Sequence, residues 1–277
     1  MRLATLFTAP TIKELSRAID ESLQGTGAVF KNLVKIREGD SRKHIVFFHS
    51  VGGNILNYSK LAKSIDPAYS VYGFQSQGTD GRSHYHTSVE QMAEEYINEL
   101  LVNIPDGPFI LCGGSMGGSI AFEAARQLKA KGKQVEHLIM FDTFGPDINI
   151  KVESKKRKRT LQSLKDSVYY RVMSKVNGFI GKIYSSLNRP IPHKVRYFNI
   201  EMNNYQAIWK YKPESYTGDI VLFRAPIANS GWYSDPHMGW RRVIKGDIFS
   251  YYLESGHNDF VEHENLPKLF NKIIKDD

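Results

Sequence analysis

The sequence feature that most constrains the fold is a cluster of glycines around one serine, Ser115. Residues 109–128, FILCGGSMGGSIAFEAARQL, pass from a short apolar stretch through four glycines into a helical pattern. In that pattern Ile120, Ala124 and Leu128 fall on one helical face. A strand that turns directly into a helix is the repeating unit of α/β proteins. The segment therefore predicts an α/β fold.

The rest of the chain contains further short apolar runs, most of them bounded by glycine or proline. They lie at 44–48, 69–74, 108–112, 137–142, 219–224 and 248–254. Continuous apolar runs separated by helical patterns are typical of a mostly parallel sheet that is covered on both faces. One covering helix is expected over 87–104, with Thr87 and Glu90 as its capping box. We therefore expect a mostly parallel central sheet flanked by helices.

Residues 145–213 interrupt this alternation. The segment is too long for a loop within a compact domain, and it contains helical patterns such as 161–187. We expect a helical lid insertion over the ends of the strands, and we expect it to be mobile.

Residues 1–27 hold one amphipathic helix. Thr11 and Glu14 form a capping box at its start, and Gly25 and Gly27 form a linker after it. Its apolar face has nothing to pack against within its own segment. We therefore expect it to be the tail of a preceding domain, with the α/β domain over residues 28–277.

The net charge of +8 is unevenly distributed. Residues 151–196 carry a net charge of +11, and the rest of the chain carries −3. The densest part, Lys155 to Arg159, lacks the interleaved aromatic residues of proteins that bind single-stranded nucleic acids. We therefore expect no nucleic-acid partner. This run has two interpretations: it is a solvated helix face, or it is a docking site for an acidic partner.

The expected compartment follows from the absence of a membrane span, a signal peptide and a disulfide. No stretch approaches the roughly 18 uninterrupted apolar residues of a membrane span, and the first residues lack the apolar core of a signal peptide. The single cysteine, Cys112, excludes an internal disulfide and favours the cytoplasm. The chemistry indicated below needs neither a metal nor a bound cofactor.

Ser115 is the candidate nucleophile. Residues 113–117, Gly-Gly-Ser-Met-Gly, match the pattern G-x-S-x-G, and the expected strand and helix on either side are the setting of a nucleophile elbow. The helix that follows places its positive N-terminal end near the hydroxyl. The sequence therefore predicts the α/β-hydrolase fold, in which an acid and then a histidine follow the serine along the chain.

Asp142 and His257 are the expected acid and base. Asp142 closes the strand that follows the elbow helix, whereas the strand at 219–224 offers no acid before Asp235. His257 lies on a glycine-preceded loop after the last expected strand. His44 and His49 precede the serine, and His263 is expected to face solvent near the start of the final helix.

An oxyanion hole requires two backbone N–H groups, one from the residue after the nucleophile and one from an early loop. Here these residues are Met116 and, after the strand at 44–48, Val51. Gly52 and Gly53 would let this loop fold close to the serine.

Six segments together resemble a known family. They are VFFHSVGGNILNYSKLAKSI, YSVYGFQSQG, FILCGGSMGGSIAFEAARQL, LIMFDTFGP, YTGDIVLFRA and SGHNDFVE. In this order they look like the type I thioesterase domains that end nonribosomal peptide and polyketide synthases. The resemblance covers residue 28 to the end, and the lid matches only weakly. LFTAPTIKELSRAID is similar to the last helix of the carrier domain that precedes such thioesterases.

The resemblance implies a reaction and a partner. Ser115 would take an acyl or peptidyl chain from the phosphopantetheine thiol of the carrier domain, with His257 as base and Asp142 orienting it. Water or a nucleophile within the chain would then release the product by hydrolysis or macrocyclisation. Two other interpretations stay open: a free-standing editing thioesterase or general serine esterase of the same fold, and a non-catalytic binding module.

Overall fold

The computed structural model describes residues 9, 11–24, 31–40, 43–81, 85–146, 161–225 and 235–275. Within them a seven-stranded sheet runs in the order β1-β3-β2-β4-β5-β6-β7. The strands are β1 (Leu33–Arg37), β2 (His44–Phe48), β3 (Ser70–Phe74), β4 (Phe109–Gly114), β5 (Val135–Phe141), β6 (Ile220–Arg224) and β7 (Ile248–Tyr252). Only β1 pairs antiparallel, with β3, and the other five pairings are parallel. The predicted mostly parallel sheet is confirmed.

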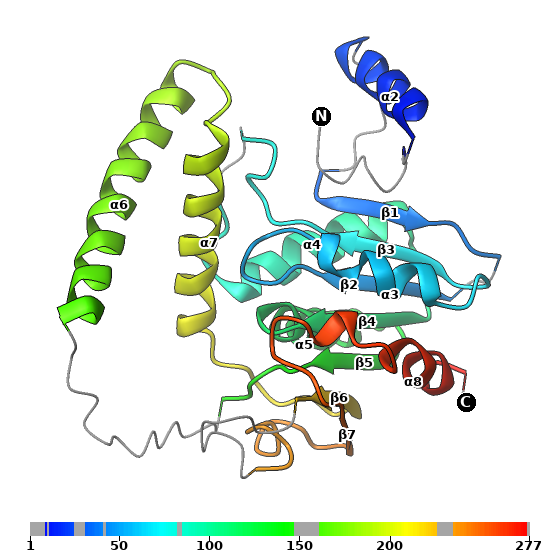
Figure 1. Cartoon of the computed structure of the whole chain (residues 1–277). Helices are drawn as coiled ribbons and strands as arrows, with labels where there is room; N and C mark the ends of the chain where they lie inside the picture. Colours follow the sequence, from blue (N-terminus) through cyan, green and yellow to red (C-terminus); the bar gives the residue numbers. More distant parts are fainter. Residues whose placement is uncertain are drawn as a thin grey trace.

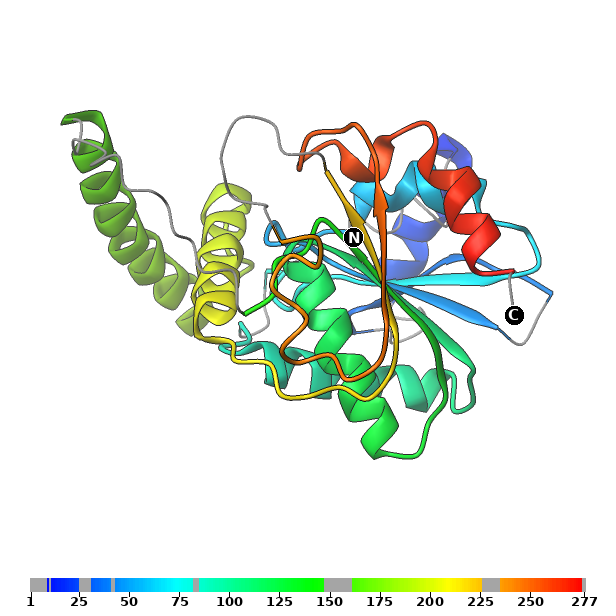
Figure 2. The ribbon, with the colours of Figure 1, turned by 90° about the horizontal axis from the view of Figure 1, so that it is seen from below.

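Helices cover both faces of the sheet. Those that the structure describes are α2 (Ile12–Gln24), α3 (Ser59–Ser64), α4 (Val89–Asn103), α5 (Met116–Ala130), α6 (Leu161–Ser186), α7 (His193–Lys210) and α8 (Leu266–Ile273). Short 3-10 turns lie at η1 (Leu56–Tyr58) and η2 (Phe260–Glu262). Helices α4 and α5 lie on one face, and α3 and α8 lie on the other (Figures 1 and 2).

Strand β2 shows why the central runs are continuously apolar. Its side chains alternate between the two faces, so that Val46 and Phe48 join the core under α4 and α5. Ile45 and Phe47 join the core under α3 and α8. All four are fully buried, as expected for a strand covered on both sides.

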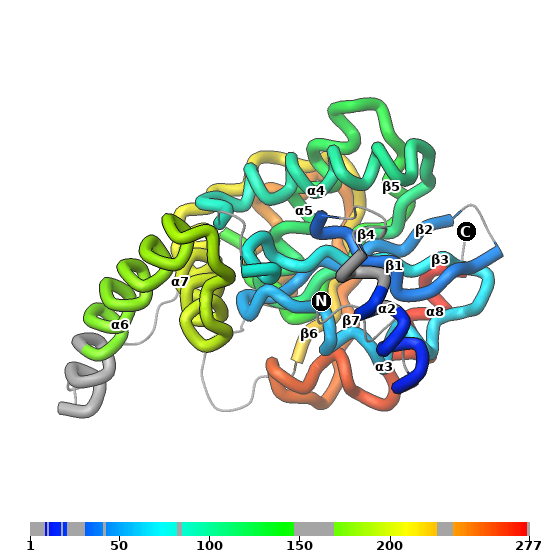
Figure 3. The backbone as a smooth tube through the Cα atoms, turned by 90° about the horizontal axis from the view of Figure 1, so that it is seen from above, coloured from blue at the N-terminus to red at the C-terminus, as the bar shows by residue number. Residues whose placement is uncertain are grey.

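Two long helices occupy the insertion between β5 and β6. Helix α7 stands next to the body of the domain, and α6 lies outside α7 as the outermost layer (Figures 1, 2 and 3). Both lie on the side of the sheet where β2 and β4 end. None of the helices in the described ranges is long and apolar enough to cross a membrane.

The helix starts agree with the sequence at one place and differ at another. At α2 the Thr11 N–H donates to Glu14 Oε2 at 3.1 Å, and the Glu14 N–H donates to Thr11 Oγ1 at 3.3 Å, which confirms that capping box. At α4 the expected Thr87–Glu90 box is wrong by one residue. Ser88 is the N-cap, and its Oγ accepts the Gln91 N–H at 3.2 Å.

Helix α2 leaves part of its apolar face uncovered. Ile12 is 90% exposed and Ile19 is 38% exposed. That α2 is the tail of a preceding domain stays a prediction. The domain boundaries at 27 and 28 stay predictions.

Candidate active site

Ser115 stands on a strained turn between β4 and α5. Its backbone has φ of 53° and ψ of −124°. Residues other than glycine rarely adopt this combination of angles. The turn is held in part by the Ser115 N–H, which donates to the carbonyl oxygen of Phe141 at 2.9 Å. The hydroxyl is therefore presented at the carboxyl end of the central strand.

The glycines around Ser115 are required by close backbone contacts. A Cβ atom at Gly113 would overlap the carbonyl group of Gly117, and a Cβ atom at Gly117 would overlap the carbonyl oxygen of Phe48. Helix α5 can therefore start close against β4 and β2 only when both positions lack a side chain. This is the physical basis of the G-x-S-x-G pattern here.

The structure brings together the three side chains that the sequence singled out. His257 Nε2 lies 3.2 Å from Ser115 Oγ. His257 Nδ1 lies 2.5 Å from Asp142 Oδ2. The side chain of Asp142 is only 3% exposed and that of His257 is 41% exposed, so the histidine lies at the mouth of the site with the carboxylate beneath it.

The contact with Asp142 determines which imidazole nitrogen is protonated. A carboxylate only accepts hydrogen bonds, so Nδ1 of a neutral His257 carries the proton. Nε2 is then free to accept the hydrogen bond of the Ser115 hydroxyl. This is the tautomer that a general base acting on serine needs.

Asp142 is anchored from strand β6. Its Oδ1 accepts the Ala225 N–H at 3.1 Å, and its own N–H donates to the Phe223 carbonyl at 2.7 Å. Asp235 is engaged elsewhere, since its carboxylate accepts the N–H groups of His237 and Gly239 in a local turn.

His49 has a structural position below the site. It is fully buried, and burial lowers its pKa to about 4. Nδ1 lies 2.8 Å from the Ser50 carbonyl, which can only accept, so Nδ1 is protonated and Nε2 accepts from Tyr96 Oη, also at 2.8 Å. The neutral ring thereby holds the start of the loop that follows β2.

His44 and His263, which the sequence analysis also considered as the base, lie away from Ser115. His44 begins β2, at the end of the strand opposite to the site. His263 follows η2, and its Nδ1 accepts the Asn265 N–H.

The two expected oxyanion donors occupy suitable elements. Met116 is the first residue of α5, and the first N–H groups of a helix have no acceptor within the helix. Val51 lies in the turn after β2, which is closed by a 2.9 Å hydrogen bond from the Gly53 N–H to the Ser50 carbonyl. Their role as donors stays a prediction.

Two side chains that the sequence analysis missed hold Gly114, the residue before the serine. Tyr58 Oη accepts the Gly114 N–H at 2.8 Å and donates to the Phe48 carbonyl at 3.0 Å. Ser50 Oγ donates to the Gly114 carbonyl at 3.1 Å. Tyr58 is fully buried, and a buried tyrosine hydroxyl needs hydrogen-bond partners. No pattern in the sequence connects Tyr58 with Gly114.

Phe144 and Asn204 were also missed. The ring of Phe144 stacks on that of His257 with centroids 6.0 Å apart. Asn204 of α7 donates from Nδ2 to the Val51 carbonyl at 2.8 Å. Phe144 follows Asp142 closely in the sequence, but no pattern in the sequence connects Asn204 with Val51.

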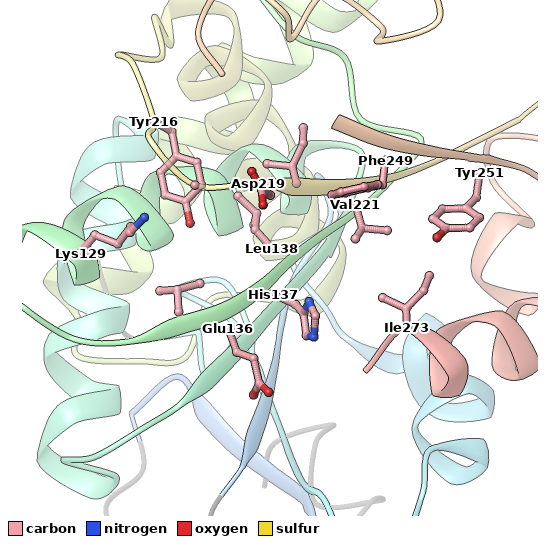
Figure 4. A pocket seen from close by; sticks show the side chains of 13 residues that line it. Lys129, Glu136, His137, Leu138, Tyr216, Asp219, Val221, Phe249, Tyr251 and Ile273 are labelled. Atoms are coloured by element: carbon pink, nitrogen blue, oxygen red, sulfur yellow. The ribbon is translucent and has the colours of Figure 1, made fainter. Parts of the chain in front are cut away.

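The cavities formed by the described residues include two that differ in their relation to the site. One of about 760 Å³ lies between α6 and α7, lined mainly by serine, asparagine and glycine residues. The other, of about 400 Å³, lies where β5 and β6 begin, with Lys129, Tyr216 and Glu136 on its walls (Figure 4). This second cavity is at the opposite end of the strands from Ser115 and takes no part in the site.

The α/β-hydrolases are the class of protein that carries this elbow and this chain order of serine, acid and histidine. A model of the thioesterase domain family matches residues 43–276. The chain therefore belongs to the thioesterase domain family.

The individual proteins that this chain resembles include synthetases and a thioesterase domain. Malpibaldin synthetase of Mortierella alpina is 26% identical over 277 residues, which cover 96% of this chain and 5% of that protein. A solved four-domain nonribosomal peptide synthetase, bound to AMP and glycine, matches with a TM-score of 0.69 and 24% identity over 96% of this chain and 21% of its own. The solved NocB thioesterase domain matches with a TM-score of 0.57 and 20% identity over 85% of this chain and 94% of its own.

These matches confirm the α/β-hydrolase fold and the resemblance to synthase thioesterase domains. The chain spans only 3 to 12% of the length of the first curated relatives it matches.

Proposed function

We propose that this chain is the chain-releasing thioesterase of a nonribosomal peptide or polyketide synthase. The observation that carries the proposal is the hydrogen-bonded series Ser115, His257, Asp142 on a nucleophile elbow, in a chain of the thioesterase domain family. The substrate is an acyl or peptidyl thioester, delivered on the phosphopantetheine arm of a carrier domain in the same synthase.

The first half of the reaction forms an acyl-enzyme. Ser115 Oγ attacks the thioester carbonyl while His257 Nε2 takes the hydroxyl proton. Asp142 stabilises the imidazolium that forms, through its contact with Nδ1. The negative charge on the tetrahedral oxygen is stabilised by the backbone N–H groups of Met116 and Val51. The C–S bond then breaks, and the leaving thiol takes the proton from His257.

The second half releases the chain. Water, or a hydroxyl or amine within the bound chain, attacks the Ser115 oxoester while His257 again takes the proton. The tetrahedral intermediate collapses, and Ser115 leaves with that proton. Water gives a free acid, and an internal nucleophile gives a macrocycle. In this scheme the chain itself holds no metal or cofactor.

Labelling with a fluorophosphonate tests the nucleophile. We expect intact-protein mass spectrometry to show one covalent adduct on the wild-type protein and none on Ser115→Ala. Ser255→Ala, which removes a hydroxyl from the loop before His257, should label normally. An adduct that persists in Ser115→Ala would refute the assignment.

Steady-state kinetics test the series as a unit. Ser115→Ala and His257→Ala should each lower kcat by several orders of magnitude, and the double variant should be little worse, because members of a catalytic unit are not additive. Asp142→Asn should have a smaller but still large effect. Activity near that of the wild type in Asp142→Asn would indicate that another residue is the acid that orients His257. Asp235 would be the first residue to test.

A further inference from the structure

Helix α6 carries a second row of apolar residues on the side that faces away from α7. The side that faces α7 includes Asn177, which is 6% exposed and whose carbonyl accepts a hydrogen bond from Asn199 Nδ2 of α7. Met173, Ile180 and Tyr184 share that side and are half-buried, and Tyr170 stacks on Phe198 of α7. The opposite side carries six large apolar residues that are each 40 to 66% exposed, which we call the outer stripe: Tyr169, Val172, Val176, Phe179, Ile183 and Leu187. Among the described helices and strands, none lies outside α6 (Figures 1, 2 and 3).

The outer stripe is continuous. Its members are separated by three or four residues along the helix and the residue that follows it, so they lie in one line. At 1.5 Å per residue the line is about 27 Å long. The apolar stripe of a helix normally faces the core, and exposed contiguous apolar surface marks an interaction site. The outer stripe is therefore a candidate binding surface.

The charges beside the stripe define the chemistry of an occupant. Successive helical residues are about 100° apart, which places Arg171, Lys175 and Lys182 together along one flank of the stripe. All three are exposed. Between Ser167 and Ile200 the chain contains six basic residues and no acidic one. The occupant must therefore accept apolar side chains and carry negative charge along the same face.

We propose that α6 is an interfacial helix that binds an anionic lipid surface with its outer stripe. A helix with an apolar line, aromatic residues within it and basic residues along its flank has the composition of helices that lie in the plane of a membrane. The stripe enters the boundary between headgroups and acyl chains, while Arg171, Lys175 and Lys182 contact lipid phosphates and carboxylates. The lid then lies against the membrane.

A second copy of the chain fits the stripe less well. Two α6 helices packed through their stripes would place rows of like charge close together, and no acid on α6 beyond Asp166 would compensate them. A single helix pair of this length also buries less surface than the roughly 1,200 Å² of a stable interface. A flat anionic surface has neither difficulty.

Vesicle binding by the full chain tests the proposal. We expect the protein to co-sediment with phosphatidylcholine vesicles that contain about one third phosphatidylserine, and not with vesicles of phosphatidylcholine alone. Binding should weaken as salt rises, because the charges are screened. Equal binding to both vesicles, or to neither, would overturn the proposal.

Matched pairs of variants locate the surface. Val176→Ser with Phe179→Ser should lower the apparent partition coefficient about tenfold or more. Val102→Ser with Phe249→Ser, an exposed pair elsewhere on the protein, should not change it. Lys175→Gln with Lys182→Gln should weaken binding, and Lys268→Gln with Lys272→Gln on α8 should not. Thermal unfolding of each variant should match that of the wild type, since all these side chains are at the surface.

Two further readouts make the result decisive. Emission from a Trp introduced as Phe179→Trp should shift to the blue on adding the anionic vesicles, because the ring leaves water. Sedimentation equilibrium without lipid should show a monomer. A dimer that Val176→Ser with Phe179→Ser dissociates, in a protein that ignores vesicles, would assign the stripe to a second copy instead. Neither result depends on thioesterase activity, so this proposal and the proposed function can fail separately.

Discussion

The side chain of Asn204 on α7 donates a 2.8 Å hydrogen bond to the backbone carbonyl of Val51. Asn204 is buried, and the neighbouring Ile200 packs so closely on Gly53 that a Cβ atom there would lie 2.6 Å from Ile200 Cγ2. The inner helix of the insertion is thus attached to the loop whose N–H is proposed to stabilise the oxyanion. The insertion is therefore in direct contact with the loop that follows β2.

We predict that Asn204 acts as a positioning residue. Asn204→Ala should lower kcat for a small soluble thioester about tenfold, which corresponds to about 1.4 kcal/mol, because the Val51 N–H loses its alignment in the transition state. KM should change less than kcat, since substrate binding is not affected directly. Asn203→Ala is the control, because the hydrogen bond from Asn203 Nδ2 to the Asn199 carbonyl lies within α7. A rise in KM with kcat unchanged would argue against this role.

The second prediction concerns Tyr58 and the residue before the nucleophile. Tyr58→Phe leaves the buried N–H of Gly114 and the carbonyl of Phe48 without this partner. We expect the free energy of unfolding to fall by about 1–3 kcal/mol, and fluorophosphonate labelling of Ser115 to slow. Urea unfolding and labelling kinetics measure the two effects. Tyr169→Phe removes an exposed hydroxyl and should change neither.

The third prediction is a loss of stability on mild acidification. Burial lowers the pKa of His49 from 6.5 to about 4, so between these values the unfolded chain binds more protons than the folded one. Stability therefore falls as the pH decreases from 6.5 to 4, by about 2 kcal/mol at pH 5. The pKa of His86 is also lowered by burial, which adds in the same direction.

Urea unfolding at pH 7 and pH 5 measures this dependence. His49→Gln should lower stability at pH 7 but lose less on going to pH 5. His193→Gln, at an exposed position of α7, should keep the wild-type pH dependence. If His49→Gln and the wild type lose equal stability, the titrating group lies elsewhere.

The sheet could be predicted because its central strands are buried on both faces and therefore read as continuous apolar runs. Strand β1 was missed because it is a half-buried edge strand, in which Lys35 and Arg37 interrupt the pattern. Ser115, Asp142 and His257 could be indicated in advance by the order of elements in an α/β sheet. Asn204 and Val51 could not, because they are 153 residues apart and only tertiary packing brings them together.

The insertion shows another limit of the sequence. Its periodicity predicts amphipathic helices but not the direction in which the apolar side points. In α6 apolar residues lie on more than one side, and only the structure shows which of them face α7 and which face solvent.

The fourth prediction is the mobility of the insertion, which the structure does not test. Hydrogen exchange should be fastest in α6, whose outer side has no cover, slower in α7, which is tied to the body of the domain through Asn204, and slowest in β4, which is fully buried. Mass spectrometry of peptides from the three elements would measure this. Uniform protection would instead indicate a rigid structural insertion.

The last prediction concerns the basic run Lys155 to Arg159, which lies outside the described residues. Carrier domains of the kind implied by the resemblance tend to be acidic, and the run precedes α6 directly in the sequence. We predict that it steers the carrier domain toward Ser115. Its effect should be on the association rate rather than on the chemical step, and it should weaken as salt rises.

Reversing several of these charges to Glu should therefore slow transfer from a carrier-bound acyl chain. The same variant should hydrolyse a small soluble thioester almost as the wild type does, because that substrate needs no docking. Stopped-flow transfer at low and high salt would separate the two, and reversal of Lys268 and Lys272 on α8 provides the matched control. An equal response of both substrates, or no response of either, would leave the run as a solvated surface with no part in docking.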